Sequence, residues 1–582
     1  MRLEDYALIG DCETAALVGR NGSIDWLCWP DFSSPACFAA LLGTKANGRW
    51  LIAPRDSTRR VTRKYRDHTL ILETTFETES GVIVLTDFMP VRERHSDIVR
   101  FVRCLHGRVR LHMELCVRFD YGRTIPWTGP QQGNEWTAAA GTGVVYLRTR
   151  VPLCNENAVT SAEFTLAAGE RRSFVLTYVP AREPPPRRVN AQVALRQTEE
   201  FWLQWTRKSR YAGAWAEAVE RSLIILKALT YRPTGGIVAA PTTSLPERIG
   251  GDRNWDYRYC WLRDAAFTLE SLLSVGYHEE ARVWQKWLLQ SVGSDISQMQ
   301  IVYGIHGERH LPESELHWLR GYDGSSPVRV GNTASEQLQL DVYGEVADTI
   351  STMSAAKLRL DPRVYQMRRQ LADRVARICS RPSSGIWEQR GVHRQFTYSK
   401  VMAWLALDRG IHAAKHGRSQ GPAVRWRQVR NRLHREICEH GFNRSLQSFV
   451  QSYHSRRLDA SSLLIPLFGF LPFEDVRVRG TLRAIEKHLA RDEFVYRVEA
   501  QSSSEREGAF LPSSFWLVQN QIMTGSKPEG RRRFEKLLKL RNDVGLLPEE
   551  YEPEAGRFLG NFPQALSHIA LINAARSMDQ HA

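Results

Sequence analysis

The first third of the chain alternates between apolar and polar positions in short runs separated by turn residues, a pattern typical of β-strands. The Asn21-Gly22 dipeptide between residues 15–18 and 24–27 is a characteristic hairpin turn. Further strand-like runs follow at residues 69–76, 81–88, 98–104, 109–115, 144–147 and 173–178. Many short strands joined by turns favour an antiparallel β-sandwich.

From Asn190 onward the apolar residues recur with the period of an α-helix. Twelve helices are predicted, near residues 212–230, 262–275, 278–292, 338–357, 362–380, 398–416, 422–440, 457–468, 478–491, 511–524, 528–541 and 563–577. Twelve helices joined by loops of uneven length fit two concentric rings of six, which is an (α/α)6 barrel. A solenoid of stacked repeats is the alternative, but the sequence shows no self-similarity at a fixed period.

A proline-rich stretch, at Pro180 and residues 184–188, separates the two patterns and predicts a stiff connection. The chain of 582 residues is also too long for one hydrophobic core. We therefore expect a multidomain protein with an N-terminal antiparallel β-sandwich and an all-α (α/α)6 barrel. The expected boundaries are residues 1–185 for the β-sandwich, 186–211 for a linker and 212–582 for the barrel.

Composition narrows the class of partner. The formal net charge is +15, from 79 basic and 64 acidic residues, but the basic residues are scattered. Their densest cluster, residues 531–541, lies on a predicted amphipathic helix, so a solvated helix face explains it and no nucleic-acid partner is expected. The 17 Trp and 18 Tyr residues suit stacking against sugar rings, although most Trp side chains in any protein simply pack.

The nine cysteines include no Cys-x-x-Cys pair, and reduced thiols in a cytoplasmic protein are the simplest interpretation. The first residues lack the basic-then-apolar pattern of a signal peptide, and no run of about 18 apolar residues predicts a membrane span. Self-association is left open. Two loose groups of His and Cys side chains follow no familiar ligand set, so we expect no metal and no other cofactor. These groups are His306, His310 and His317, and His434, Cys438 and His440.

The chemically unusual residues lie in five loops between the predicted helices. These loops span residues 253–264, 303–339, 385–390, 492–510 and 545–553. The long loops at one end of a barrel are where a rigid scaffold presents its chemistry. We therefore expect these loops to meet at one rim and to build the site.

Two of the loops carry a carboxylate that could take part in catalysis. Glu388 follows Trp387, whose face offers a platform for a sugar ring and an apolar wall that keeps a carboxylic acid protonated near neutral pH. Glu549 lies in a proline-bounded loop before a helix. Two carboxylates across a cleft are what glycoside hydrolysis needs, but the sequence alone does not separate an inverting from a retaining route. A buried Trp followed by a surface Glu is the simpler alternative for the first loop.

Arg263 and Asp264 begin a predicted helix in a loop that holds four aromatic residues. Together these two side chains can bond the hydroxyl groups of a sugar in a fixed orientation. The alternative is a structural ion pair at a helix N-terminus, where a carboxylate is stabilising in any case.

Several motifs in order resemble one known family. In the helical half they are Trp261-Leu262-Arg263-Asp264, Gly385-Ile386-Trp387-Glu388 and Leu547-Pro548-Glu549-Glu550-Tyr551. This half resembles glycoside hydrolase family 15, which includes glucoamylases, glucodextranases and bacterial trehalases. The first 50 residues and the segment 560–568 resemble the bacterial trehalase-like branch, so the resemblance covers nearly the whole chain.

The resemblance implies a β-sandwich, an (α/α)6 barrel and inverting hydrolysis of terminal α-glucosidic bonds without a metal. Carried over by motif, Glu388 matches the general acid and Glu549 the general base. The residues that match substrate-binding positions are Arg263 and Asp264, which grip the non-reducing glucose, Trp387, which forms a wall of the same subsite, and Arg497. Glu550 is the other candidate for the base, and Gln389 replaces a carboxylate that glucoamylases have directly after the acid.

These observations predict an exo-acting hydrolase that releases β-glucose from a small carbohydrate, with trehalose favoured and maltooligosaccharides next. An α-glucoside phosphorylase and a non-catalytic glucan-binding protein are the alternatives. A phosphorylase needs no base and a binding protein needs neither carboxylate, so Glu388 and Glu549 argue against both. The choice among trehalose, maltose, isomaltose and dextrin, and the question whether N-terminal loops reach the site, stay open.

Overall fold

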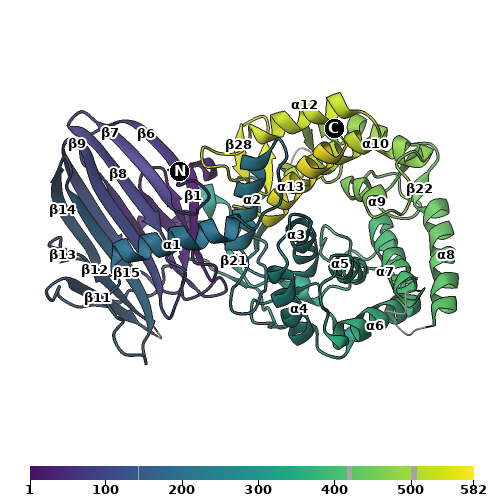
Figure 1. The fold of residues 1–582 in the computed structure, drawn as a ribbon, viewed down its shortest axis with the longest axis horizontal. Helices are drawn as coiled ribbons and strands as arrows, with labels where there is room; N and C mark the ends of the chain where they lie inside the picture. Colours follow the sequence, from purple (N-terminus) through teal and green to yellow (C-terminus); the bar gives the residue numbers. More distant parts are fainter. Residues whose placement is uncertain (142, 416–421, 500–506, 582) are drawn as a thin grey trace.

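A computed structural model describes residues 1–141, 143–415, 422–499 and 507–581 of the chain. It consists of an N-terminal domain of antiparallel β-sheet, followed by a helical domain (Figure 1). The change from sheet to helix near residue 190 confirms the division predicted from the apolar pattern. Within the described part of the chain, none of the helices combines the length and the apolar character needed to cross a bilayer.

The N-terminal domain is built around one long strand, β9 (Ser96–Cys116). Its first half pairs with β8 and β15, and its second half pairs with β5 and β14. The larger strands are β1 (Tyr6–Gly10), β2 (Ala15–Gly19), β3 (Ser23–Cys28), β5 (Arg49–Pro54), β6 (Thr58–Tyr65), β7 (Leu72–Thr78), β8 (Gly81–Phe88), β11 (Glu135–Ala140), β12 (Gly143–Arg148), β14 (Val159–Ala167) and β15 (Arg171–Pro180). The predicted Asn21-Gly22 hairpin is present between β2 and β3.

The prediction of separate strands at 98–104 and 109–115 is wrong, because both belong to β9. The residues between them contain one turn residue, Gly107. The strand passes this point through a register shift, in which Val82 pairs with His106 while Ile83 pairs with Cys104. One extra residue is thus absorbed as a bulge rather than as a turn.

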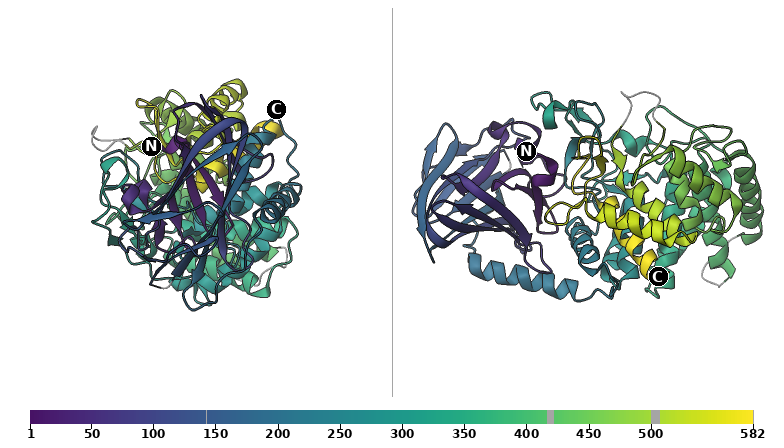
Figure 2. Two further views of the ribbon diagram at one scale, coloured as in Figure 1. Left: turned by 90° about the vertical axis from the view of Figure 1, so that its left-hand side faces the viewer. Right: turned by 90° about the horizontal axis from the view of Figure 1, so that it is seen from above.

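The segment 186–211, expected to be a linker, contains helix α1 (Ala191–Thr206). Asn190 caps the helix by accepting hydrogen bonds from two backbone N–H groups. Ala191 and Ala194 near its start pack on the β-domain, while Trp205 near its end stacks on Tyr277 of the helical domain with 4.2 Å between ring centroids. The helix runs alongside both domains (Figure 2) and joins them as a packed element.

The helical domain contains a counterpart for each of the twelve predicted helices. They are α2 (Ala216–Ala228), α3 (Leu262–Ser274), α4 (Glu279–Val292), α5 (Asp341–Ala355), α6 (Pro362–Ile378), α7 (Thr397–Lys415), α8 (Ala423–His440), α9 (Leu464–Leu467), α10 (Val476–His488), α11 (Leu511–Met523), α12 (Lys527–Leu538) and α13 (Ala565–Gln580). The helix predicted at 457–468 is reduced to α9 and a preceding 3-10 turn, Ala460–Leu463. Residue 416, the predicted end of the 398–416 helix, lies outside the described residues.

The helices fall into two classes by burial. Helices α3, α5, α7 and α11 are buried around most of their circumference. Helix α8 buries only one stripe, formed by Trp426, Val429, Leu433 and Ile437, and α6 and α12 are similarly one-sided. The first class therefore lies inside the domain, and the one-sided helices cover it.

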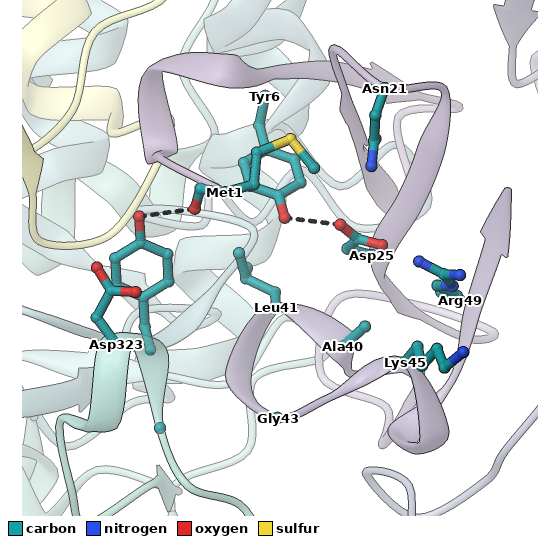
Figure 3. Close-up of a pocket in the computed structure, with 12 residues that line it drawn as sticks. Met1, Tyr6, Asn21, Asp25, Ala40, Leu41, Gly43, Lys45, Arg49 and Asp323 are labelled. Carbon is teal, nitrogen blue, oxygen red and sulfur yellow. Dashed lines mark hydrogen bonds between the residues drawn. The ribbon is translucent and has the colours of Figure 1, made fainter. Parts of the chain in front are cut away.

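The two domains share one cluster of buried apolar side chains, and polar contacts also join them. Trp26 of β3 donates from its indole nitrogen to the Pro241 carbonyl at 2.8 Å, and the buried Arg63 of β6 pairs with Asp543 at 2.5 Å. A cavity of about 300 Å³ lies at this boundary between N-terminal residues and the loop around Tyr322 (Figure 3). The Tyr322 hydroxyl donates to the Met1 carbonyl at 3.0 Å across it. The first residues of the chain thus contact the 303–339 loop.

Candidate active site

One cavity of about 610 Å³ in the helical domain collects residues from all five loops singled out in the sequence. The six candidate side chains on its wall are Arg263, Asp264, Trp387, Glu388, Arg497 and Glu549. Gln389, the residue in place of a second carboxylate, also lines it. Residues 500–506, the Ser-rich and acidic part of the predicted 492–510 loop, lie outside the described residues.

Glu388 occupies a tight turn in which its N–H donates to the Gly385 carbonyl at 2.9 Å. Its φ of 56° is in the left-handed region, which a residue other than glycine rarely adopts. Oε1 accepts hydrogen bonds from the Trp261 indole at 2.9 Å and from Arg263 Nη1 at 3.3 Å. Burial raises the pKa of the Glu388 carboxyl, which Arg263 partly opposes. Gln337 donates to the Glu388 carbonyl at 3.1 Å and holds the turn from outside.

Trp387 is fixed at both its edge and its faces. Its indole nitrogen lies 3.0 Å from each carboxylate oxygen of Asp459, a buried residue that caps the 3-10 turn before α9. The ring packs edge-on against Phe510 and stacks near Trp516, with centroid distances of 5.4 and 6.4 Å. The sequence analysis missed Asp459. Its only signal is the Asp-x-Ser cap pattern, which predicts a helix start and not a role in a site.

Arg263 and Asp264 stand at the first turn of α3, and Arg263 Nε donates to Asp264 Oδ2 at 3.1 Å. The ion pair given as the alternative interpretation is therefore present, but it is on the cavity wall. Arg263 Nη1 also donates to the Ile386 carbonyl at 3.1 Å, and so links α3 to the turn of Glu388. Beneath the pair, burial raises the pKa of the Glu345 carboxyl of α5.

Glu549 is buried, with 1% of its surface exposed, and three donors surround its carboxylate. Oε1 accepts from the Tyr257 hydroxyl and from Arg497 Nη2, each at 2.8 Å, while Oε2 accepts from the Asn561 N–H at 3.1 Å. Burial raises the pKa of this carboxyl to about 7, and Arg497 is the largest influence in the other direction. Neither Tyr257 nor Asn561 was selected from the sequence as a site residue.

The guanidinium group of Arg497 is bonded to carboxylates rather than directed into the open cavity. Besides Glu549 it contacts Glu550, which is fully buried, and it donates to Glu507 at 3.1 Å. Its guanidinium carbon lies 4.1 Å from the centroid of the Phe510 ring. The positive charge of Arg497 is thus surrounded by several acidic side chains.

One group of acidic residues in the described ranges has the spacing of a metal site. The carboxylates of Glu247, Glu549 and Glu550 offer oxygens that lie within 4.8 Å of one another. The Arg497 guanidinium bonds two of these residues and lies 3.9 Å from Glu247. This side chain already supplies the group with a positive charge.

The two carboxylates are linked through an aromatic pair. Tyr257, which bonds Glu549, packs edge-on against Trp261, which bonds Glu388, with 5.4 Å between the ring centroids. Both rings belong to the aromatic loop at 253–264. Both carboxylates therefore line the same cavity with different donors around each, and burial raises the pKa of both.

The loop of Glu549 is also supported from beneath by a buried histidine. His568 Nε2 of α13 accepts from the Leu547 N–H at 3.3 Å, so the proton is on Nδ1, 3.0 Å from Ser222 Oγ. Burial, with the charges of Arg541 and Arg221, lowers the His568 pKa to about 3.

This histidine predicts an acid sensitivity of the fold. The unfolded chain binds the His568 proton below about pH 6.5 and the folded chain only near pH 3, so stability falls as the pH decreases through that window. Between pH 7 and pH 5 the loss from this residue is about 2 kcal/mol. Urea unfolding at both pH values is expected to show a smaller loss in His568→Gln than in the wild type. An equal loss in both proteins would contradict this assignment.

Comparison with known proteins decides the family. A model described as glycosyl hydrolases family 15 matches residues 213–576, and one described as trehalase-like, N-terminal matches residues 1–134. The chain belongs to glycosyl hydrolases family 15. The helical domain and its cavity are therefore the family 15 part of the protein, and the protein is a glycosidase.

Proteins named trehalases match this chain over almost its full length. A trehalase of Mycobacterium tuberculosis is 35% identical over 98% of this chain and 89% of its own, and a trehalase of Thermoplasma volcanium is 34% identical over 100% and 94%. The crystal structure of a bacterial glucoamylase complexed with acarbose covers 100% of this chain and 94% of its own at 13% identity, with a TM-score of 0.74. This structural likeness shows a shared fold.

Proposed function

We propose that the protein is an inverting, exo-acting α-glucosidase whose favoured substrate is trehalose. The observation that carries the proposal is the pair of carboxylates in one cavity, the half-buried Glu388 and the buried Glu549, each with its own set of donors. The family 15 relatives named trehalases match nearly all of this chain, which supports the choice of trehalose over other α-glucosides.

Glu388 is proposed as the general acid. Its Oε1 already accepts from Trp261 and Arg263, so the proton is carried on Oε2. Burial favours the protonated form, which can transfer its proton to the glycosidic oxygen as the bond to the anomeric carbon breaks. The same Arg263 contact then stabilises the carboxylate that remains.

Glu549 is proposed as the general base. Three donors, from Tyr257, Arg497 and Asn561, favour its ionised form and oppose the effect of burial. The lone pairs that they leave free can take a proton from a water molecule on the face of the sugar opposite to the leaving group. Attack from that face inverts the anomeric centre and gives β-glucose.

The remaining candidates are proposed to bind the terminal glucose. Asp264, 1% exposed and paired with Arg263, offers a carboxylate edge to sugar hydroxyls. Trp387 offers an apolar wall whose orientation Asp459 holds. Arg497 is proposed to act mainly by holding Glu549 ionised, since its donors are already bonded to carboxylates.

We also propose the finer architecture: a β-sandwich over residues 1–185, a connection over 186–211 and an (α/α)6 barrel over 212–582. The inner and covering classes of helix and the likeness to a bacterial glucoamylase support the barrel. All nine cysteines are free thiols, which supports a reducing compartment such as the cytoplasm.

The test of the proposed function is the stereochemistry and specificity of glucose release. Proton NMR of fresh product from trehalose is expected to show α- and β-glucose in equal amounts before mutarotation, because attack inverts one residue to β-glucose while the leaving residue keeps its α configuration. Glucose release from trehalose, maltose, isomaltose and a dextrin is expected to be fastest from trehalose. Initial release of α-glucose alone would exclude inversion, and faster cleavage of maltose would exclude the trehalose preference.

A further inference from the structure

Tyr257, which donates its hydroxyl to Glu549, lies between two residues that form a buried ion pair. Side chains alternate in an extended segment, so Asp256 and Arg258 share the side opposite to Tyr257. Arg258 donates from Nε to Asp256 Oδ1 at 2.9 Å and from Nη2 to Oδ2 at 2.6 Å. This bidentate pair fixes the backbone on both sides of Tyr257.

The guanidinium group of Arg258 also contacts the N-terminal domain. Nη1 donates to the Ser34 carbonyl at 2.9 Å, and Nη2 donates to the Tyr121 hydroxyl at 2.8 Å. The guanidinium carbon also lies 5.4 Å from the centroid of the Tyr121 ring. Arg258 and Tyr121 are both buried, so these contacts lie in surroundings of low polarity that strengthen them.

A second contact from the N-terminal domain supports the segment paired with Tyr257. The backbone of Tyr257 is hydrogen-bonded to Ala240 and Thr242. Between these two residues, the Pro241 carbonyl accepts the hydrogen bond from the buried indole of Trp26. The position of Tyr257 is therefore set from both sides by residues of the β-domain.

The N–H donor to Glu549 is supported in the same way. Asn561 follows β28 (Arg557–Leu559), which pairs with β27 (Glu550–Glu552) directly after the candidate base. The Phe558 N–H of β28 donates to Glu4 Oε1 at 3.1 Å. Glu4 belongs to the first turn of the chain, Leu3–Asp5, so the N-terminal domain holds the outer strand of this hairpin.

We infer that the N-terminal domain is a structural part of the active site, in which Arg258 with Tyr121, and Glu4, are positioning residues that aim the Tyr257 hydroxyl and the Asn561 N–H at Glu549. The inference rests on the proposed role of Glu549 as base. The charged groups that face Glu549 itself are Arg497, Glu247 and Glu550. Tyr121 and Glu4 act through other residues and leave those charges unchanged.

The test uses Tyr121→Phe and Glu4→Ala in the full-length chain. Replacing Arg258 would leave the buried Asp256 carboxylate unpaired and endanger folding, whereas Tyr121→Phe removes one hydroxyl. Weaker donation to Glu549 destabilises its ionised form, so the acid limb of the kcat/KM profile is expected to move to higher pH by roughly 0.5–1 unit. The expected kcat is about three- to tenfold lower with KM within about twofold of the wild type.

Two matched variants separate positioning from general loss of stability. Glu4→Gln keeps an acceptor for the Phe558 N–H and is expected to restore the wild-type pH profile. Arg232→Gln breaks another interdomain ion pair, with Glu13 at 2.8 Å, and is expected to lower the melting temperature without moving the acid limb. Glu4→Ala also removes a negative charge, and this loss by itself would shift the acid limb to lower pH. That direction is opposite to the shift expected from weaker donation to Glu549.

Two results would overturn the inference. One is a melting temperature that falls in Tyr121→Phe and Glu4→Ala while the acid limb and kcat stay at wild-type values. The other is the same displacement of the acid limb in Arg232→Gln. A failure of the proposed function itself is seen separately, as near-normal turnover in Glu549→Gln.

Discussion

Glu388→Gln is expected to lower kcat for trehalose by about a hundred- to ten-thousandfold, because the variant has no proton to give to the leaving oxygen. The amide keeps an acceptor for the Trp261 indole, so the turn and the fold are expected to persist. Glucose release measures the loss, and circular dichroism and the melting temperature check the fold.

A substrate whose leaving group needs no proton isolates the role of Glu388. α-Glucosyl fluoride releases fluoride, a weak base, so its hydrolysis is expected to stay within about tenfold of the wild-type rate in Glu388→Gln. The comparison assigns the lost step to proton donation. Equal losses on trehalose and on the fluoride would contradict the acid role.

Glu549→Gln is expected to abolish hydrolysis of both substrates, since either reaction needs a water molecule activated by the base. The predicted loss in kcat is again about a hundred- to ten-thousandfold. Glucose release from trehalose and from α-glucosyl fluoride, each at saturating substrate, is the measurement. Near-normal turnover of either substrate would exclude Glu549 as the base.

Glu550→Gln is the matched control, because Glu550 is adjacent to Glu549 in the sequence and has different surroundings. Glu550 is fully buried and bonds Arg497, whereas Glu549 is on the cavity wall. The expected loss of kcat is at most about tenfold, from a displaced Arg497. A larger loss in Glu550→Gln than in Glu549→Gln would exchange the two assignments.

The helical period predicted the helices of the second domain well, because long amphipathic segments such as α8 repeat their apolar stripe over several turns. The same periodicity predicted α7 and α11, although the structure buries both around most of their circumference. Helix α1 was assigned to a linker, since the prolines before it dominate the local pattern. Its packing partners, such as Tyr277, lie far away in the sequence.

The site was predictable where one loop holds adjacent unusual residues, as in Trp387-Glu388 and Arg263-Asp264. Partners that meet only after folding gave no local signal. Asp459 bonds Trp387 across 72 positions, and Asn561 contributes a backbone N–H that no side-chain pattern encodes. Tyr257 was within a loop already selected, but its target Glu549 lies 292 residues further on.

The left-handed backbone conformation at Glu388 lowers the stability of the fold at the same residue whose side chain is the proposed acid. Holding a glutamate at a φ of 56° costs roughly 1–3 kcal/mol relative to relaxed backbone, and glycine is the residue that this turn would accommodate without strain. Glycine carries no proton donor, so the residue that best fits the turn is one that could not serve as the proposed acid. Selection for stability alone would therefore favour glycine over the proposed acid, and the glutamate marks a position where folding free energy is lost while a carboxyl group is kept on the cavity wall.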